Sequence, residues 1–140
     1  MNNPSVRAIV VTHGTMAAGL VDAVRQITGL DEQALVPLSN RGLSPEALAA
    51  EVRTHVQGAT VVFTDLPSGS CGFAVRRHCQ DLPDLVIVSG VNLPMLLEFA
   101  MFRELPLAEL VPRLVAKGRS AITSPSLNTE SHEHRALSSG

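Results

Sequence analysis

Short apolar runs alternate along the chain with longer segments in which apolar residues recur every three or four positions. The first run, within residues 7–12, contains the β-branched stretch Ala8-Ile9-Val10-Val11 without polar alternation, which is typical of a strand buried on both faces. Similar short strands are predicted over residues 34–38, 60–64 and 85–88. Strands of this kind belong to parallel sheets.

Helices are predicted between and after these strands. Residues at helical spacing follow His13-Gly14, and Gly29 provides a C-terminal stop; the apolar positions are Met16, Leu20, Val24 and Ile27. In the next unit Ser44 precedes Pro45, a pair typical of an N-cap and first helical position, and the buried stripe is Leu48, Val52 and Val56. A third helix is predicted to end at about His78.

The last third of the chain contains two more predicted helices and a polar tail. Residues 91–102 are apolar almost all round, which indicates a helix wedged between elements or lining an interface with a second subunit. A final helix is predicted over residues 107–117, with Pro112 kinking it or moving its start and Gly118 ending it. Residues 124–140 have too few apolar side chains to offset the entropy of ordering, so we predict a flexible tail after one domain at residues 1–123.

The repeated strand and helix units predict a doubly wound α/β fold with helices on both faces of a mostly parallel sheet. We expect the strand order 2-1-3-4, with an antiparallel edge strand as an option near the C-terminus. In this order the ends of the first and third strands are neighbours.

Composition narrows the class of protein. The chain has 140 residues, 17% of them charged, and a net charge of −2, which gives no basic excess to attract nucleic acid or an anionic membrane. No apolar run reaches the ~18 residues of a membrane span and the N-terminus lacks a signal peptide pattern, so we expect a cytoplasmic protein without membrane insertion. Cys71 and Cys79, about 12 Å apart if they share a helix, are expected to be reduced thiols.

Polar residues gather where the strands end, which is where doubly wound folds place their chemistry. His13 follows the first strand and Asp65 the third. A nucleophilic histidine needs one ring nitrogen free and the other held as a donor, and Asp65 can be the acceptor. A phosphoryl group on His13 would then meet the backbone amides of the loop at a helix N-terminus and nearby hydroxyls, and we predict phosphate contacts from Thr12, Ser68, Gly69 and Ser70.

The same residues also fit structural roles. His13 fits a polar plug at a strand end, and Asp65 fits an N-cap or a loop-tightening residue. No set of Cys, Asp or His residues has the spacing of a structural zinc site, and His132 and His134 in the tail would hold a metal only weakly. We therefore predict no metal and no cofactor.

Three segments resemble the mannose-family enzyme IIA domains of the bacterial phosphotransferase system, over about residues 6–120. They are Ile9-Val10-Val11-Thr12-His13-Gly14, Asp65-Leu66-Pro67-Ser68-Gly69-Ser70 and Ser89-Gly90-Val91-Asn92-Leu93-Pro94-Met95-Leu96-Leu97-Glu98. The resemblance implies that His13 accepts a phosphoryl group from HPr and delivers it to a separate enzyme IIB, that Asp65 hydrogen-bonds the histidine, and that the protein is a homodimer. The family's Gly-Gly-Ser-Pro loop reads Ser68-Gly69-Ser70-Cys71 here, so a positive φ at Ser68 would introduce strain.

Four functions remain open on the sequence. The first is a phosphocarrier in sugar uptake, and the second is a regulatory protein whose His13 phosphorylation controls the binding of a partner. The third is an interaction protein with a decayed site, and the fourth is the phosphocarrier subunit of a dihydroxyacetone kinase. Phosphorylation separates the third from the others, and onward transfer to an enzyme IIB identifies the first.

Overall fold

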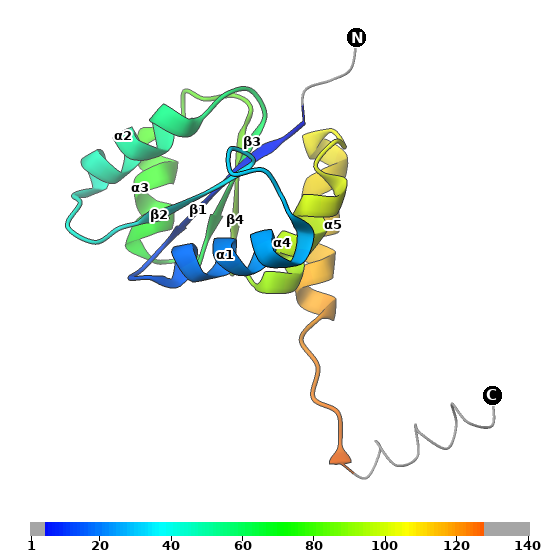
Figure 1. The fold of residues 1–140 in the computed structure, drawn as a ribbon. Helices are drawn as coiled ribbons and strands as arrows, with labels where there is room; N and C mark the ends of the chain where they lie inside the picture. The colour runs from blue at the N-terminus through cyan, green and yellow to red at the C-terminus, as the bar shows by residue number, and fades with distance from the viewer. Residues whose placement is uncertain (1–4, 128–140) are drawn as a thin grey trace.

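The strands form one parallel sheet. A computed structural model describes residues 5–127 of the chain and contains β1 (Arg7–Thr12), β2 (Leu35–Ser39), β3 (Thr60–Thr64) and β4 (Leu85–Ser89). Their order is β2-β1-β3-β4, and each neighbouring pair is parallel (Figure 1). The α/β class and the order 2-1-3-4 are confirmed, and each predicted strand agrees with the observed one to within one residue.

Helices cover both faces of the sheet (Figure 1). One face packs against α1 (Met16–Thr28), α4 (Leu93–Phe102) and α5 (Leu107–Ser120), and its core contains the edge-to-face pair Phe63 and Phe99 with ring centroids 5.9 Å apart. The other face packs against α2 (Pro45–His55) and α3 (Ser70–His78), which contribute Leu48 and Cys71 among others. The sheet is therefore buried on both sides, as its unbroken apolar strands require.

The buried face of α1 differs in part from the predicted stripe, of which Val24 is buried and Leu20 packs against the core. Met16 and Ile27 are 42% and 61% exposed, whereas Ala17, Val21 and Val24 are buried against the sheet. Two adjoining apolar stripes run along this helix, and the one with smaller side chains faces the sheet. Helical spacing alone does not distinguish adjoining stripes, because both satisfy the same period.

The end of α5 also differs from its prediction. The helix begins at Leu107 and contains Pro112, as expected, but it continues through Gly118 to Ser120. A Cβ added at Gly118 would lie 2.6 Å from the Cε atom of Met95 on α4. Gly118 is therefore a close-packing position between α4 and α5 and does not end the helix.

The antiparallel edge strand is absent from the part of the chain that the structure describes. All four strands within residues 5–127 are parallel, and residues 122–126 after α5 have no regular structure. Residues 128–140, most of the predicted tail, lie outside the described residues. Within the described residues, no helix has the length and hydrophobicity to cross a membrane.

Candidate active site

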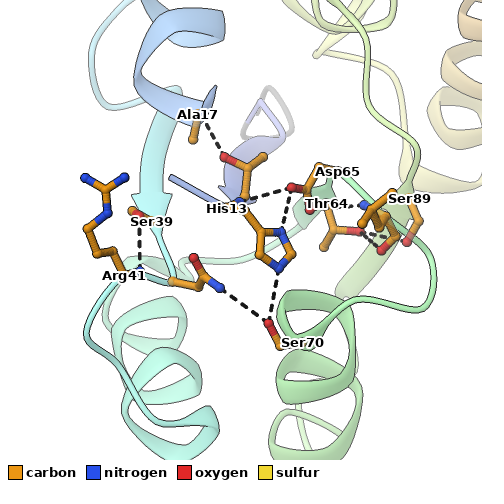
Figure 2. Close-up of polar contacts among 11 residues, drawn as sticks. His13, Ala17, Ser39, Arg41, Thr64, Asp65, Ser70 and Ser89 are labelled. Carbon is orange, nitrogen blue, oxygen red and sulfur yellow. Dashed lines mark hydrogen bonds and ion pairs between the residues drawn. The ribbon is translucent and has the colours of Figure 1, made fainter. Parts of the chain in front are cut away.

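Two neighbouring strands bring His13 and Asp65 together. In the parallel register Val11 of β1 pairs with Thr64 of β3, so the residues that follow these strands emerge at the same edge of the sheet. The Nδ1 atom of His13 lies 2.8 Å from Oδ2 of Asp65 (Figure 2). Residues 52 positions apart in the sequence thus form one hydrogen-bonded pair, as the strand order predicts.

Three hydrogen bonds hold the Asp65 carboxylate. Its Oδ2 atom accepts from the backbone N–H of His13 at 3.0 Å as well as from the imidazole, and its Oδ1 atom accepts from the N–H of Leu66 at 3.0 Å. Partial burial favours the neutral acid, but the hydrogen bonds from His13 outweigh it and hold the pKa of Asp65 below its usual value. Asp65 is therefore ionised at neutral pH and acts only as an acceptor.

This contact fixes the tautomer of His13. An ionised carboxylate has no proton to donate, so Nδ1 must carry the proton of the neutral imidazole and Nε2 must carry the lone pair. The Nε2 atom points toward the start of α3, where the Ser70 hydroxyl lies 3.4 Å away (Figure 2). The side chain of His13 is 45% exposed, so solvent reaches the ring that the Asp65 contact orients.

The first turn of α3 faces the His13 imidazole. Gly69 is the N-cap and the first intrahelical bond runs from the N–H of Phe73 to the carbonyl of Gly69 at 3.1 Å, so the N–H groups of residues 70–72 precede it. A helix N-terminus of this kind favours anions. Gly69 lies close to the ring, because a Cβ added there would be 3.2 Å from Cε1 of His13.

The predicted phosphate contacts divide into two groups. Gly69 and Ser70 lie beside His13, whereas Ser68 is exposed and precedes the first residue of α3 by two positions. Thr12 is fully buried, and its hydroxyl accepts a hydrogen bond from the N–H of Ala17 at 2.7 Å. The structure therefore places the Thr12 hydroxyl at the start of α1.

The altered loop carries no unusual backbone conformation. Among residues 5–127, only glycines have positive φ angles, so Ser68 lacks the strain considered from the sequence. Cys71 is a free and fully buried thiol beneath the first turn of α3. Burial raises the pKa of the Cys71 thiol and the nearby Asp65 charge raises it further, which makes this group a neutral thiol at pH 7.

Two residues at this edge were not predicted from the sequence. Asn40 follows β2, its N–H donates to the Thr12 carbonyl at 3.2 Å, and its amide nitrogen lies 3.4 Å from the Ser70 hydroxyl. The guanidinium of the next residue, Arg41, lies 3.4 Å from the position that a Cβ would take at Gly14, where φ is +61°. The sequence signal that could have identified them is their position directly after β2, which is a neighbour of β1 in the sheet.

The third segment of the resemblance has a structural role. Asn92 is the N-cap of α4, where its Oδ1 atom accepts from the N–H of Met95 at 3.1 Å. Its amide nitrogen donates to the Gly118 carbonyl on α5 at 3.0 Å. This asparagine therefore joins α4 to α5. Within residues 5–127, its side-chain hydrogen bonds go to these two helices and not to the His13 imidazole.

Comparisons with known proteins identify the family of the chain. The family described as PTS system fructose IIA component (EIIA-man) matches residues 7–115. The sorbose-specific EIIA component of Klebsiella pneumoniae is 30% identical over 96 residues, which cover 66% of this chain and 71% of that protein.

Solved structures show the same architecture. The mannose/sorbose-specific IIA subunit of Enterococcus faecalis superposes with a TM-score of 0.76 at 25% identity, covering 89% of this chain and 97% of that one. The EIIA component of Streptococcus agalactiae superposes with a TM-score of 0.78 at 22% identity, covering 85% and 96% of the two chains. At such identity the second likeness supports the fold alone.

Proposed function

Because the chain belongs to the mannose-type EIIA family of the sugar phosphotransferase system, we propose that it carries a phosphoryl group on His13, received from HPr and passed to a separate enzyme IIB. Membership of this family implies phosphotransfer in sugar uptake in general terms. The observation that supports the specific role of His13 is its 2.8 Å contact with Asp65, which leaves Nε2 as the free nitrogen.

The proposed step is a displacement at phosphorus. The Nε2 lone pair forms the new N–P bond while the bond between phosphorus and the donor breaks, and the donor keeps that electron pair. The imidazole becomes positively charged, and the Asp65 carboxylate stabilises that charge through the Nδ1–H hydrogen bond. The N–H groups of the first turn of α3 are positioned for the phosphoryl oxygens, and transfer to the acceptor reverses the step.

The surface around His13 suits a protein donor better than a small molecule. Three large apolar side chains on the segments that follow β1 and β3 are half exposed: Met16 at 42%, Leu66 at 53% and Phe73 at 51%. Met16 and Leu66 lie close to the site, since the N–H of Met16 faces the carbonyl of His13 and Leu66 packs against the Gly69 position. Exposed apolar residues around a polar centre are typical of protein docking surfaces.

We also propose that the protein is a cytoplasmic homodimer. Met101 on α4 and Ile122 after α5 are 71% and 77% exposed, and a second subunit would cover apolar surface of this kind. Equilibrium sedimentation should give twice the chain mass of 14.8 kDa at micromolar concentration. A monomer under these conditions would remove the dimer from the proposal.

Phosphorylation with labelled phosphoenolpyruvate, enzyme I and HPr tests the carrier role directly. The native chain should acquire an acid-labile label, His13→Ala should acquire none, and His55→Ala at the end of α2 should match the native chain. Release of the label on addition of an enzyme IIB would show onward transfer, and retention would favour a regulatory role. An unlabelled native chain, with HPr shown to be charged, would contradict the proposal.

A further inference from the structure

Three side chains of different chemistry meet beneath the first turn of α3. The ligand atoms of His13, Asp65 and Cys71 all lie within 4.8 Å of one another. They come from the end of β1, the end of β3 and the start of α3, so only the assembled sheet brings them together. We propose that these three residues form a binding site for a zinc-like divalent cation, and that metal binding and phosphorylation of His13 exclude each other.

The donor set matches the preferences of zinc. Imidazole nitrogen, carboxylate oxygen and thiolate sulfur are the three ligand types that Zn²⁺ uses in proteins, and three protein ligands with an open fourth position form a recurrent arrangement. When Cys71 is a thiolate, Asp65 is ionised and His13 is neutral, the three ligands carry two negative charges, which neutralise a divalent cation. Calcium and magnesium prefer oxygen ligands, so a mixed nitrogen, oxygen and sulfur set favours a softer metal.

The geometry requires only small side-chain movements. Zinc bond lengths of about 2.0–2.3 Å in a tetrahedron place ligand atoms roughly 3.3–3.6 Å apart. The His13 to Asp65 contact of 2.8 Å must open slightly, and any separation near the 4.8 Å limit must close by about 1 Å. The half-exposed His13 ring can make this adjustment and leaves a route from solvent, while Cys71 is held by the helix.

Metal binding would change where the imidazole proton lies. Coordination through Nδ1 displaces the proton from that nitrogen, and a neutral imidazole then carries its proton on Nε2. The Cys71 thiol releases its own proton to solvent as the metal–sulfur bond forms. Nε2 has lost its lone pair in this state and cannot attack phosphorus. This consequence rests on the proposed function, whereas the metal site itself does not.

Cys71 distinguishes this loop from the family pattern described above. The resembled loop has proline at this position, and proline offers no ligand atom. Cys79, the other free cysteine, is also buried but lies beyond the last residue of α3. It therefore provides a matched control, because its substitution removes a buried thiol of the same kind without touching the proposed site.

Cobalt binding tests the site without any phosphotransfer reaction. The full chain carrying His132→Ala and His134→Ala, under reducing conditions, should bind one Co²⁺ with a thiolate-to-cobalt absorption band in the near ultraviolet. Cys71→Ala and His13→Ala should each lower the affinity by at least about tenfold, because ligand loss costs no less than loss of an outer-shell partner. Cys79→Ala should keep both band and affinity. Absence of the band from the folded parent chain, or its persistence in folded Cys71→Ala, would overturn the proposal.

Labelling in the presence of zinc tests the mutual exclusion. HPr is first phosphorylated and then separated from enzyme I, so that zinc cannot act on the charging reaction. Zinc should then suppress labelling of the native chain and of Cys79→Ala. Cys71→Ala, compared with its own zinc-free reaction, should lose most of this suppression. A cobalt band without suppression would keep the metal site and refute the exclusion, whereas an unlabelled native chain that binds cobalt would refute only the carrier role.

Discussion

Two loops at the same edge of the sheet perform different tasks. The loop after β3 directs Asp65 to His13, whereas the loop after β4 directs Asn92 into the cap of α4 and onto the Gly118 carbonyl. Both loops are polar, and both carry part of the family resemblance. The difference is their distance from β1: β3 is its direct neighbour and β4 is one strand further away. A family signature can therefore mark a site or a structural joint.

Two glycines repeat this contrast. Gly69 lies against the imidazole, where an added Cβ would be 3.2 Å from Cε1 of His13, and Gly118 lies against Met95 between two helices. The absence of a side chain serves the chemistry of the site in one case and helix packing in the other. Substitutions in the two regions should consequently separate effects on phosphorylation from effects on stability.

The largest effect is expected from Asp65→Asn. The variant lacks the negative charge that fixes the proton on Nδ1 and stabilises the charged imidazole, so the rate of His13 labelling should fall about 10²- to 10⁴-fold. Rapid-quench measurement of label uptake from charged HPr checks this. Thermal unfolding controls for the fold, and a labelling rate within about threefold of the native value would contradict the role of Asp65.

Asn92→Ala should show the opposite pattern. Loss of the α4 cap costs about 1 kcal/mol and loss of the bond to the Gly118 carbonyl about 1 kcal/mol more, so the free energy of unfolding should fall by about 2 kcal/mol. Urea denaturation measures this change, with half-buried Asn40→Ala, which removes only the 3.4 Å contact with the Ser70 hydroxyl, as the control. The different roles of the two loops would be contradicted if Asn92→Ala kept the unfolding free energy of the native chain. They would also be contradicted if its labelling rate fell as far as that of Asp65→Asn.

Gly118→Ala should lower stability by about 1 kcal/mol. The added methyl group crowds Met95, and overpacking of about 1–3 kcal/mol is partly offset by the higher helix propensity of alanine. Gly19→Ala in α1 is a matched control, since nothing lies within 4 Å of its Cβ position. The control should gain about 0.5–1 kcal/mol by urea denaturation. Equal stabilisation of both variants would show that α4 and α5 are not closely packed here.

Gly69→Ala should have the smallest effect. Its φ of −81° and ψ of 168° suit alanine, so stability should be kept, while the imidazole must shift by a few tenths of an ångström. We expect labelling to slow by about threefold to tenfold, because transfer depends on the position of the reacting atom. Quench kinetics beside an unfolding curve would measure both, and an unchanged rate would show that the ring tolerates the methyl group.

Much of the fold followed from the apolar pattern alone. Unbroken β-branched runs predicted the parallel strands, and Ser44 with Pro45 predicted the start of α2, where the Ser44 hydroxyl accepts from the N–H of Ala47. The buried face of α1 was not predictable, because Met16 and Ile27 have the same helical spacing as residues that do pack. Gly118 looked like a helix end, since sequence does not reveal that a neighbouring helix needs the space of a side chain.

The site was also only partly predictable from the sequence. His13 and Asp65 follow neighbouring strands, and parallel strand order alone brings their side chains to one edge. The contacts of Asn40 and Arg41 depend on how the loop after β2 folds over that edge, and the local sequence pattern does not predict this. The hydrogen bond between the Thr12 hydroxyl and the N–H of Ala17 was not predicted either, because it depends on how α1 packs against the end of β1.

The sequence by itself determined the strands, the helices and the chemical types of residue at the strand ends, because these depend on local periodicity and propensity. Only the tertiary structure decided which atoms meet, including the proton on Nδ1 of His13, the packing role of Gly118 and the approach of Cys71 to His13 and Asp65. Hydrogen bonds and metal coordination depend on distances of a few ångströms between distant residues. Those distances exist only after the sheet has assembled.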